Sequence, residues 1–336
     1  MTNKIKKVAE KEHASPQVGT PRKAQSFNNV VKQLAVRFGL VIVLFLLITA
    51  ISFLSPYFLK EENLFNVLLQ AAINLIIALG MTYVIATGGI DLSVGSIVGL
   101  SGMAMAKMLI AGVSLPLASA ITLLLGMLMG SINGLLITRI GLPPFIATLG
   151  TMSIYRGLAL IVSDGRPVYG LSAKVLQVIS GRVGPIPIPV IISLIAAGIA
   201  FFVIKRTVIG EYTLAIGGNE EAVRLSGVPV ARYKTIVYLI SGLMCAVAGI
   251  VLTARLTAAE PIAGTGYELD AIAAVVIGGT SLQGGVATIP GTLIGAFIMS
   301  VLRNGLNLLN IQSYYQLLAI GLVIVIAVAI DKLRKT

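Results

Sequence analysis

The chain has very little of the side-chain chemistry that most enzymes use. Its 336 residues include one Cys, one His and no Trp. A disulfide within the chain and a zinc site of His and Cys are both excluded. A triad that needs a histidine is excluded too, because the single histidine, His13, lies in a polar N-terminal stretch. These shortages argue against an enzyme and against a metal or cofactor held by this chain.

Charge is also scarce. Only 11% of residues are charged and 57% are hydrophobic, with a mean hydropathy of +0.97. Soluble domains carry about 25% charged residues, so a water-soluble globule is excluded, and the apolar content excludes disorder over most of the length. The apolar runs are continuous rather than alternating, which argues against a β-barrel. The composition predicts an all-α, polytopic membrane helical bundle.

About ten segments are candidates to cross a bilayer, for which about 20 mostly apolar residues are needed. Nine are good candidates, at 34–54, 64–86, 92–112, 115–138, 143–162, 186–204, 234–254, 289–309 and 314–331. The first is followed by no small-residue cleavage site, so we interpret it as a retained helix rather than a signal peptide. The tenth, 268–280, is weaker, because Glu268 and Asp270 stand at its start. Ten crossings are favoured; the alternative is a re-entrant segment with nine.

The net charge of +12 is concentrated at the two ends of the chain. Cytoplasmic segments of membrane proteins carry an excess of Lys and Arg, so this rule explains the charge better than nucleic-acid binding does. We expect a flexible basic cytoplasmic tail at 1–33, a transmembrane domain at 34–331 with a cytoplasmic loop at 205–234, and a basic cytoplasmic end at 332–336. Two cytoplasmic termini require an even number of crossings. The outer loop 163–185 departs from the rule, because it carries Arg166, Lys174 and Arg182.

The loop 205–234 contains the signals of a short helix. Asn219 is a good N-cap, Glu220 and Glu221 suit the positive end of the helix dipole, and Gly227 suits the position after the helix. A helix of about two turns is unstable alone in water, so it must be docked on something. Two interpretations stay open: a surface helix packed on its own bundle, and a helix held out for a cytoplasmic partner.

Residues 221–227 (Glu-Ala-Val-Arg-Leu-Ser-Gly) resemble the Glu-Ala-Ala-x-x-x-Gly signature of ABC importer permeases, with Val223 in place of the second Ala. Longer stretches agree with this resemblance: 80–82 (Gly-Met-Thr), 88–96 (Gly-Gly-Ile-Asp-Leu-Ser-Val-Gly-Ser), 145–149 (Phe-Ile-Ala-Thr-Leu), 264–276 (Gly-Thr-Gly-Tyr-Glu-Leu-Asp-Ala-Ile-Ala-Ala-Val-Val), 278–282 (Gly-Gly-Thr-Ser-Leu) and 313–316 (Ser-Tyr-Tyr-Gln). Over about residues 35–330 the chain is similar to the permease subunit of ribose-type monosaccharide ABC importers. Permeases for xylose, allose, galactose and autoinducers share much of the pattern.

The resemblance implies a homodimer in the bacterial inner membrane, a cytoplasmic ATP-binding subunit, and an extracytoplasmic sugar-binding protein. It also implies the residues that couple the permease to the ATPase: Asn219, Glu220, Glu221, Ala222, Arg224, Ser226 and Gly227. The sequence agrees on one independent point, since it contains no Gly-x-x-x-x-Gly-Lys-[Ser/Thr] phosphate loop. We therefore expect ATP and Mg²⁺ to be bound by the partner subunit.

Polar groups inside a membrane are costly and are expected to face an interior or a pathway. Sugar hydroxyls need hydrogen-bond donors and acceptors, so we take these residues as possible pathway-lining groups: Asn74, Asn133, Thr148, Ser153, Tyr155, Arg156, Asn304, Asn307, Tyr314, Tyr315 and Gln316. Arg156 is the most costly of them, and one interpretation is that it extends towards the outer membrane surface.

Two further patterns concern packing. Gly126, Gly130 and Gly134 repeat every four residues, which lets helices approach closely, either within one bundle or between subunits. Gly88 and Gly89 end one predicted helix and Asp91 is expected to cap the next, accepting from the N–H of Ser93 or Val94. A role of this turn in gating or subunit contact is the alternative.

Two other classes of function are an ion-coupled secondary transporter and a membrane-embedded enzyme. An ion-coupled secondary transporter would use Asp91, Glu268 and Asp270 as coupling carboxylates, but all three lie near predicted helix ends, a poor place for a relay. A membrane-embedded enzyme is disfavoured by the absence of paired carboxylates within a span.

Overall fold

The structure is a computed structural model that describes the backbone of residues 22–333 and the side chains of 38–329 and 332. Most of the predicted basic tail 1–33, and most of the basic end 332–336, therefore lie outside the described residues. The chain divides into two compact units, 1–42 and 43–336. The described part of the first unit is the beginning of one helix, which starts at Arg22. The second unit holds the remaining elements.

The described residues form thirteen helices and a short hairpin. In chain order the elements are α2 (Arg22–Leu54), α3 (Glu61–Ala86), α4 (Val94–Ile110), α5 (Leu115–Thr138), α6 (Pro144–Ser163), α7 (Ala173–Ser180), β1 (Arg182–Val183), β2 (Ile186–Pro187), α8 (Ile188–Arg206), α9 (Val208–Gly218), α10 (Glu220–Leu225), α11 (Val230–Leu256), α12 (Tyr267–Ile277), α13 (Ile289–Leu308) and α14 (Ser313–Leu333). The prediction of a helical polytopic membrane protein is confirmed at this level.

Six helices, α3, α5, α6, α8, α11 and α13, are long and apolar enough to cross a membrane. Three further apolar helical stretches are shorter, at Phe38–Leu54, Val94–Ile110 and Ser313–Ala329. The weak tenth segment, 268–280, largely coincides with α12, whose 11 residues extend only about 16 Å. This is about half of the hydrocarbon thickness of a bilayer, so α12 alone does not span it.

Helix α11 lies at the centre of the second unit and packs against α3, α4 and α5. The contact with α5 depends on Gly126, Gly130 and Gly134. A Cβ atom at Gly130 would collide with the carbonyl oxygen of Tyr238 on α11, and one at Gly134 would lie 2.7 Å from the Cα of Thr235. The glycine ridge predicted from the sequence is therefore used for packing within the chain.

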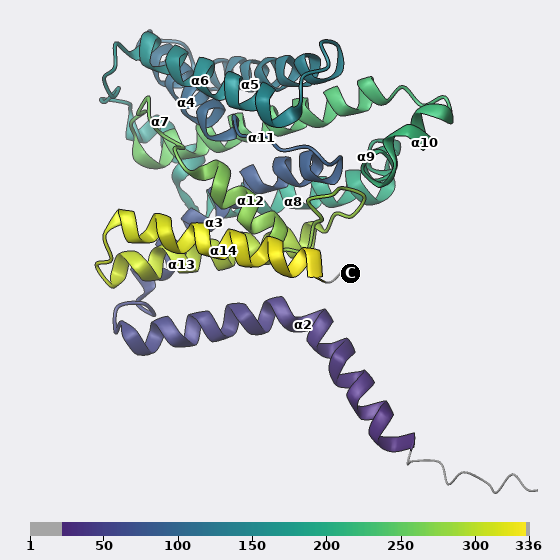
Figure 1. Cartoon of the computed structure of the whole chain (residues 1–336). Coiled ribbons are helices and arrows are strands. Elements are labelled where there is room, and N and C mark those ends of the chain that lie inside the picture. Colours follow the sequence, from purple (N-terminus) through teal and green to yellow (C-terminus); the bar gives the residue numbers. More distant parts are fainter. Residues whose placement is uncertain (1–21, 334–336) are drawn as a thin grey trace, which may run out of the picture. The chain divides into compact units, whose positions relative to one another are not determined.

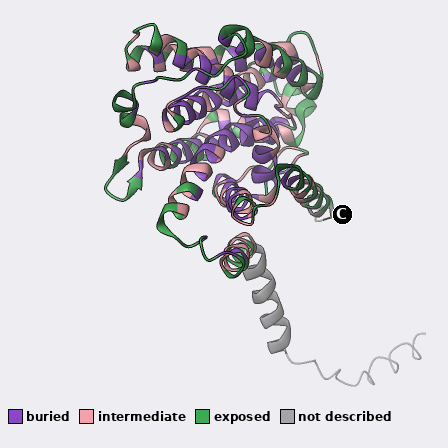
Figure 2. Cartoon of the chain, turned by 90° about the vertical axis from the view of Figure 1, so that its left-hand side faces the viewer, coloured by how far each residue is buried: buried purple, intermediate pink, exposed green. Residues whose placement is uncertain are grey.

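Buried residues are concentrated in the middle of the bundle, and exposed ones on its outer helices (Figure 2). Large apolar side chains are exposed on α6, α8 and α14, as at Ile161, Phe202 and Leu318. Such surfaces match a lipid environment rather than water.

Figure 1 shows α9, α10 and the C-terminal end of α14 at one end of the bundle, and α7 at the other. The sequence did not predict α7 within the loop 163–185, the β1–β2 hairpin at the end of that loop, or α9 within the loop 205–234. The strand β2 (Ile186–Pro187) leads directly into α8.

Candidate functional site

Helix α10 forms where the capping signals placed it. Asn219 has an extended backbone, and its side-chain oxygen accepts a 2.9 Å hydrogen bond from the N–H of Ala222. Glu220 and Glu221 occupy the first turn. Gly227 follows the helix with a φ of 81°, a left-handed conformation that glycine adopts without strain. The predicted short helix and its cap are confirmed.

One ion pair at the first residue of α10, and one aromatic contact between its neighbouring helices, hold α10 in place. Lys234, near the start of α11, forms a 3.0 Å ion pair with Glu220. Tyr212 of α9 and Tyr233 of α11 meet edge to face, with ring centroids 4.6 Å apart. These contacts fix the ends of α9 and α11 that flank α10, so the short helix is attached to the bundle through its neighbours.

The rest of α10 faces away from the chain. None of its residues is buried, and Leu225 is 79% exposed. Arg224 donates a 2.8 Å hydrogen bond to Glu221, which lowers the pKa of the Glu221 carboxyl from its usual value. Leu225 is therefore an exposed apolar side chain beside Arg224, on a short helix with no buried residue. Leu225 could not be singled out from the sequence, because six residues are too few for a helical period to identify an outward face.

A junction of three glycine-containing turns connects α9 to the bundle. The N–H of Gly285 donates a 3.0 Å hydrogen bond to the carbonyl of Ala86, at the end of α3. A Cβ at Gly217, near the end of α9, would collide with that same carbonyl, and one at Gly284 would lie 2.7 Å from the Cα of Gly217. The end of α3, the end of α9 and the α12–α13 turn are thus in backbone contact directly before α10.

Asp91 lies in the turn that leads into α4, two residues before the N-cap residue Ser93. It is fully buried and accepts hydrogen bonds from the N–H and the hydroxyl of Ser93, at 3.0 and 2.6 Å. The predicted hydrogen bond from the N–H of Ser93 is present, but Asp91 is not the N-cap residue itself, because α4 begins only at Val94. Asp91 also accepts a 3.0 Å bond from Ser241 of α11, and Asn133 of α5 donates to the Ser93 hydroxyl at 2.7 Å. The same carboxylate therefore joins three helices, which the local sequence could not show.

The other two acidic residues singled out in the sequence lie at the start of α12. Asp270 forms a two-pronged ion pair with Arg303 of α13, at 2.6 and 2.9 Å. Glu268 accepts a 3.2 Å bond from the N–H of Gly266. Arg156 of α6 donates 2.7 Å hydrogen bonds to the carbonyls of Pro261 and Ala263.

The remaining polar candidates do not gather around one cavity. Asn304 exchanges two hydrogen bonds with Asn63, at 2.8 and 3.0 Å, and Gln316 donates to Asn307 at 2.7 Å. Tyr155 donates to a carbonyl of α5 at 2.9 Å. Most of these groups are engaged in holding helices together.

Four candidates form few hydrogen bonds with the side chains of other helices. Asn74 has a buried side-chain oxygen without a partner. Thr148 bonds to carbonyls of its own helix and of Ile90, Ser153 is exposed and makes one weak 3.4 Å bond, and Tyr315 is exposed beside Tyr314.

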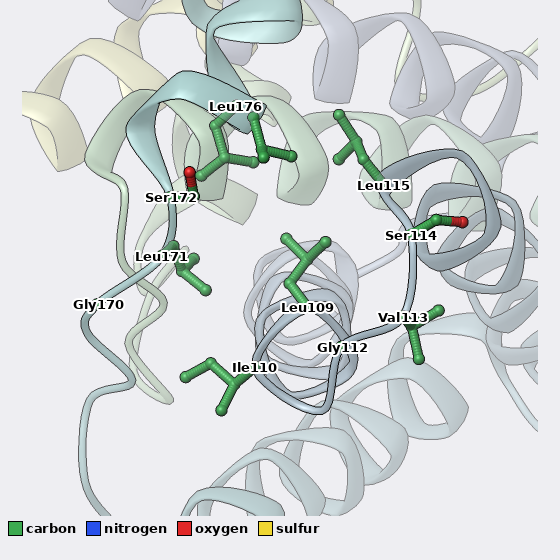
Figure 3. Close-up of a pocket in the computed structure, with 11 residues that line it drawn as sticks. Leu109, Ile110, Gly112, Val113, Ser114, Leu115, Gly170, Leu171, Ser172 and Leu176 are labelled. Carbon is green, nitrogen blue, oxygen red and sulfur yellow. The ribbon is translucent and has the colours of Figure 1, made fainter.

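A pocket of about 630 Å³ lies at the end of the bundle opposite α10, between the α4–α5 turn and residues 170–176. Figure 3 shows leucine and isoleucine side chains directed into it, with the hydroxyls of Ser114 and Ser172 as the only polar side-chain groups. A sugar needs several hydrogen-bonding groups, so this apolar pocket is not assigned as a sugar site.

A polytopic helical bundle with apolar side chains exposed on its outer helices defines an integral membrane protein. The family model described as branched-chain amino acid transport system / permease component matches residues 63–328, and the chain belongs to that family. It is a multi-pass permease of the bacterial inner membrane and a transport component rather than an enzyme.

Relatives support the same conclusion. The chain is 48% identical over 319 residues to the ribose import permease protein RbsC of Bacillus subtilis (strain 168), covering 94% of this chain and 98% of the relative. It is 44% identical over 299 residues to the D-allose transport system permease protein AlsC of Escherichia coli (strain K12), covering 88% and 92%. The L-arabinose transport system permease protein AraH of the same strain is 36% identical over 317 residues, covering 94% and 95%. The resemblance to ribose-type ABC importer permeases is confirmed. No solved structure matches the chain.

Proposed function

We propose that this chain is the transmembrane permease subunit of an ATP-driven importer that passes a monosaccharide from an extracytoplasmic binding protein into the cytoplasm. Ribose is the first choice of substrate, because the ribose permeases of B. subtilis and Haemophilus influenzae are 48% and 46% identical to this chain. The D-allose relative follows at 44%, so allose is the nearest competitor.

The observation that carries the proposal is the exposed helix α10. It is capped by Asn219, tethered by Lys234, and presents Leu225 to its surroundings. We assign it as the docking site of the ATP-binding subunit. That partner subunit, and not this chain, would bind ATP and Mg²⁺. Asn219, Glu220, Glu221, Ala222, Arg224, Ser226 and Gly227 form or flank this docking helix. The glycine junction gives movement of α10 a direct route to the ends of α3 and α12.

The membrane arrangement that fits this function has ten crossings, both termini in the cytoplasm, and two copies of the chain in lipid. The tenth crossing would combine residues 257–266, which are irregular, with α12. Together they run from the end of α11 to the turn at the glycine junction. The C-terminal end of α14 lies at the same end of the bundle as α10 (Figure 1), which agrees with a cytoplasmic C-terminus.

The experiment is reconstitution of the permease with its ATP-binding subunit and binding protein in proteoliposomes. Accumulation of D-ribose should require ATP and all three components. Unlabelled D-allose and L-arabinose, added as competitors, identify the preferred sugar. Accumulation driven by an ion gradient without ATP would contradict the proposal and favour a secondary transporter.

A further inference from the structure

Two buried aspartates of the bundle differ in how their charge is compensated. Asp270 is 4% exposed and pairs with the guanidinium of Arg303 through two hydrogen bonds. Asp91 is completely buried, yet none of the ion pairs in the described part of the chain includes it. A buried charge is normally paired with an opposite charge or bound to a metal ion, because removing it from water is very costly. The charge of Asp91 therefore needs a partner.

Hydrogen bonds and a helix end compensate only part of this charge. The Asp91 carboxylate accepts from the N–H and the hydroxyl of Ser93 and from the hydroxyl of Ser241. All of these donors are neutral. The N-terminus of the following helix, α4, carries the equivalent of about half an elementary positive charge, which does not balance a full negative charge.

Two buried oxygen atoms close to Asp91 have no hydrogen-bond partner among the described residues. Asn133 donates from its amide nitrogen to the Ser93 hydroxyl at 2.7 Å, but its side-chain oxygen is unpartnered, as is the hydroxyl of Tyr238. Both residues are completely inaccessible to solvent. A Cβ at Gly89 would lie 2.6 Å from the Tyr238 hydroxyl, which places this hydroxyl at the turn that carries Asp91. Buried polar atoms without a partner are rare and indicate a bound water or ion.

A proton, a water molecule and a metal cation would satisfy these groups to different extents. A proton on Asp91 removes its charge but gives the Asn133 oxygen no donor. A water molecule can donate to that oxygen but leaves the charge. A monovalent cation does both, since it neutralises the carboxylate and binds the amide oxygen directly.

A divalent cation fits this site poorly. Ca²⁺ takes about six to eight oxygen ligands, and Mg²⁺ usually keeps several waters, whereas the site offers one carboxylate and is closed to solvent. No group of three or more His, Cys, Asp or Glu side chains that could hold a metal ion occurs among the described residues. One carboxylate with neutral oxygens around it matches a single positive charge.

We propose that the chain binds a monovalent metal cation, such as Na⁺, through the carboxylate of Asp91, the side-chain oxygen of Asn133 and the hydroxyl of Tyr238. Hard cations prefer oxygen ligands, so the scarcity of His and Cys does not bear on this site. The ion is structural, because it joins the α3–α4 turn to α5 and α11. It thereby fixes the end of α3, whose Ala86 carbonyl belongs to the glycine junction. This inference goes beyond the proposed function and does not depend on the sugar.

The first measurement is binding of radioactive Na⁺ to the full-length permease, purified in choline chloride. The wild-type chain should bind one ion per chain. Asp91→Asn keeps the shape of the side chain but removes its charge, and should abolish binding. Tyr238→Phe removes one hydroxyl and should weaken binding roughly ten-fold or more, as is typical when a metal site loses a supporting group. Competition with K⁺ and Li⁺ identifies the monovalent ion that fits best.

Thermal unfolding is the second measurement. A ligand that binds only the folded state stabilises it by mass action. Replacing choline with Na⁺ at constant ionic strength, at about a hundred times the dissociation constant, should raise the wild-type midpoint by roughly 5 °C. Asp91→Asn should unfold at the same temperature in both salts.

The matched control is the double variant Asp270→Asn with Arg303→Gln. It also removes a buried carboxylate, but one that already has an ion partner. Its Na⁺ binding should equal that of the wild type.

The inference is overturned if the wild type binds none of the three monovalent ions, as a buried water or a protonated Asp91 would require. Equal binding by the wild type and Asp91→Asn would also overturn it. If Asp91→Asn does not fold, Tyr238→Phe decides, through weakened or unchanged binding. Failure of the reconstituted complex to accumulate D-ribose would overturn the proposed function and leave the ion-binding result standing, so the two failures are distinguishable.

Discussion

Truncating Leu225 tests the assignment of α10 as a docking helix. Leu225→Ala removes three carbons from a side chain that is 79% exposed in the single chain. If the ATP-binding subunit buries this surface, the lost burial amounts to about 2 kcal/mol at about 0.8 kcal/mol per carbon. Binding of the ATP-binding subunit should therefore weaken roughly 20- to 30-fold.

The assay is titration of the detergent-solubilised permease with its ATP-binding subunit, together with thermal unfolding of the permease alone. Unfolding should be unchanged, because Leu225 makes few contacts within the chain. Leu318→Ala is the control: Leu318 is 68% exposed but lies on α14, so its truncation should leave binding intact. Unchanged affinity for Leu225→Ala would refute the assignment.

Three further changes test the packing around the site. Asn219→Ala removes the cap of α10, worth about 1 kcal/mol, and should reduce ATP-driven transport, whereas Asn219→Asp should retain it. Gly130→Ala forces a Cβ into α11 and should lower the melting temperature by several degrees, while Gly150→Ala, with open space around it, should not. Asp270→Asn leaves Arg303 without its ion partner and should destabilise the permease by up to about 3 kcal/mol. The double variant with Arg303→Gln should regain part of that loss, as measured by thermal unfolding; equal losses in the single and double variants would contradict the pairing.

Local signals in the sequence were sufficient to predict most of the helices, including the short helix α10. Asn219, the two glutamates and Gly227 act within a few residues of one another, so their pattern predicts a capped helix without knowledge of the fold. The apolar runs identify the membrane helices for a similar reason. A segment surrounded by lipid must satisfy its backbone groups within its own helix, whatever distant residues it later contacts.

The interactions between distant segments could not be predicted. Asp270 and Arg303 are 33 residues apart, and Asp91 and Ser241 are 150 apart. No local pattern marks either pair. The hydrogen bonds of Arg156 to carbonyls more than 100 residues away could not be predicted either, because hydropathy does not reveal the irregular path of the segment that carries those carbonyls.

The side of the membrane on which α10 lies, and whether the ATP-binding subunit covers it, can be measured together. Ser226→Cys places a thiol beside α10, and the native Cys245 is fully buried and should not react with a membrane-impermeant maleimide. The account predicts labelling in inside-out vesicles only, and protection when the ATP-binding subunit is added. Labelling in right-side-out vesicles, or no protection, would contradict it.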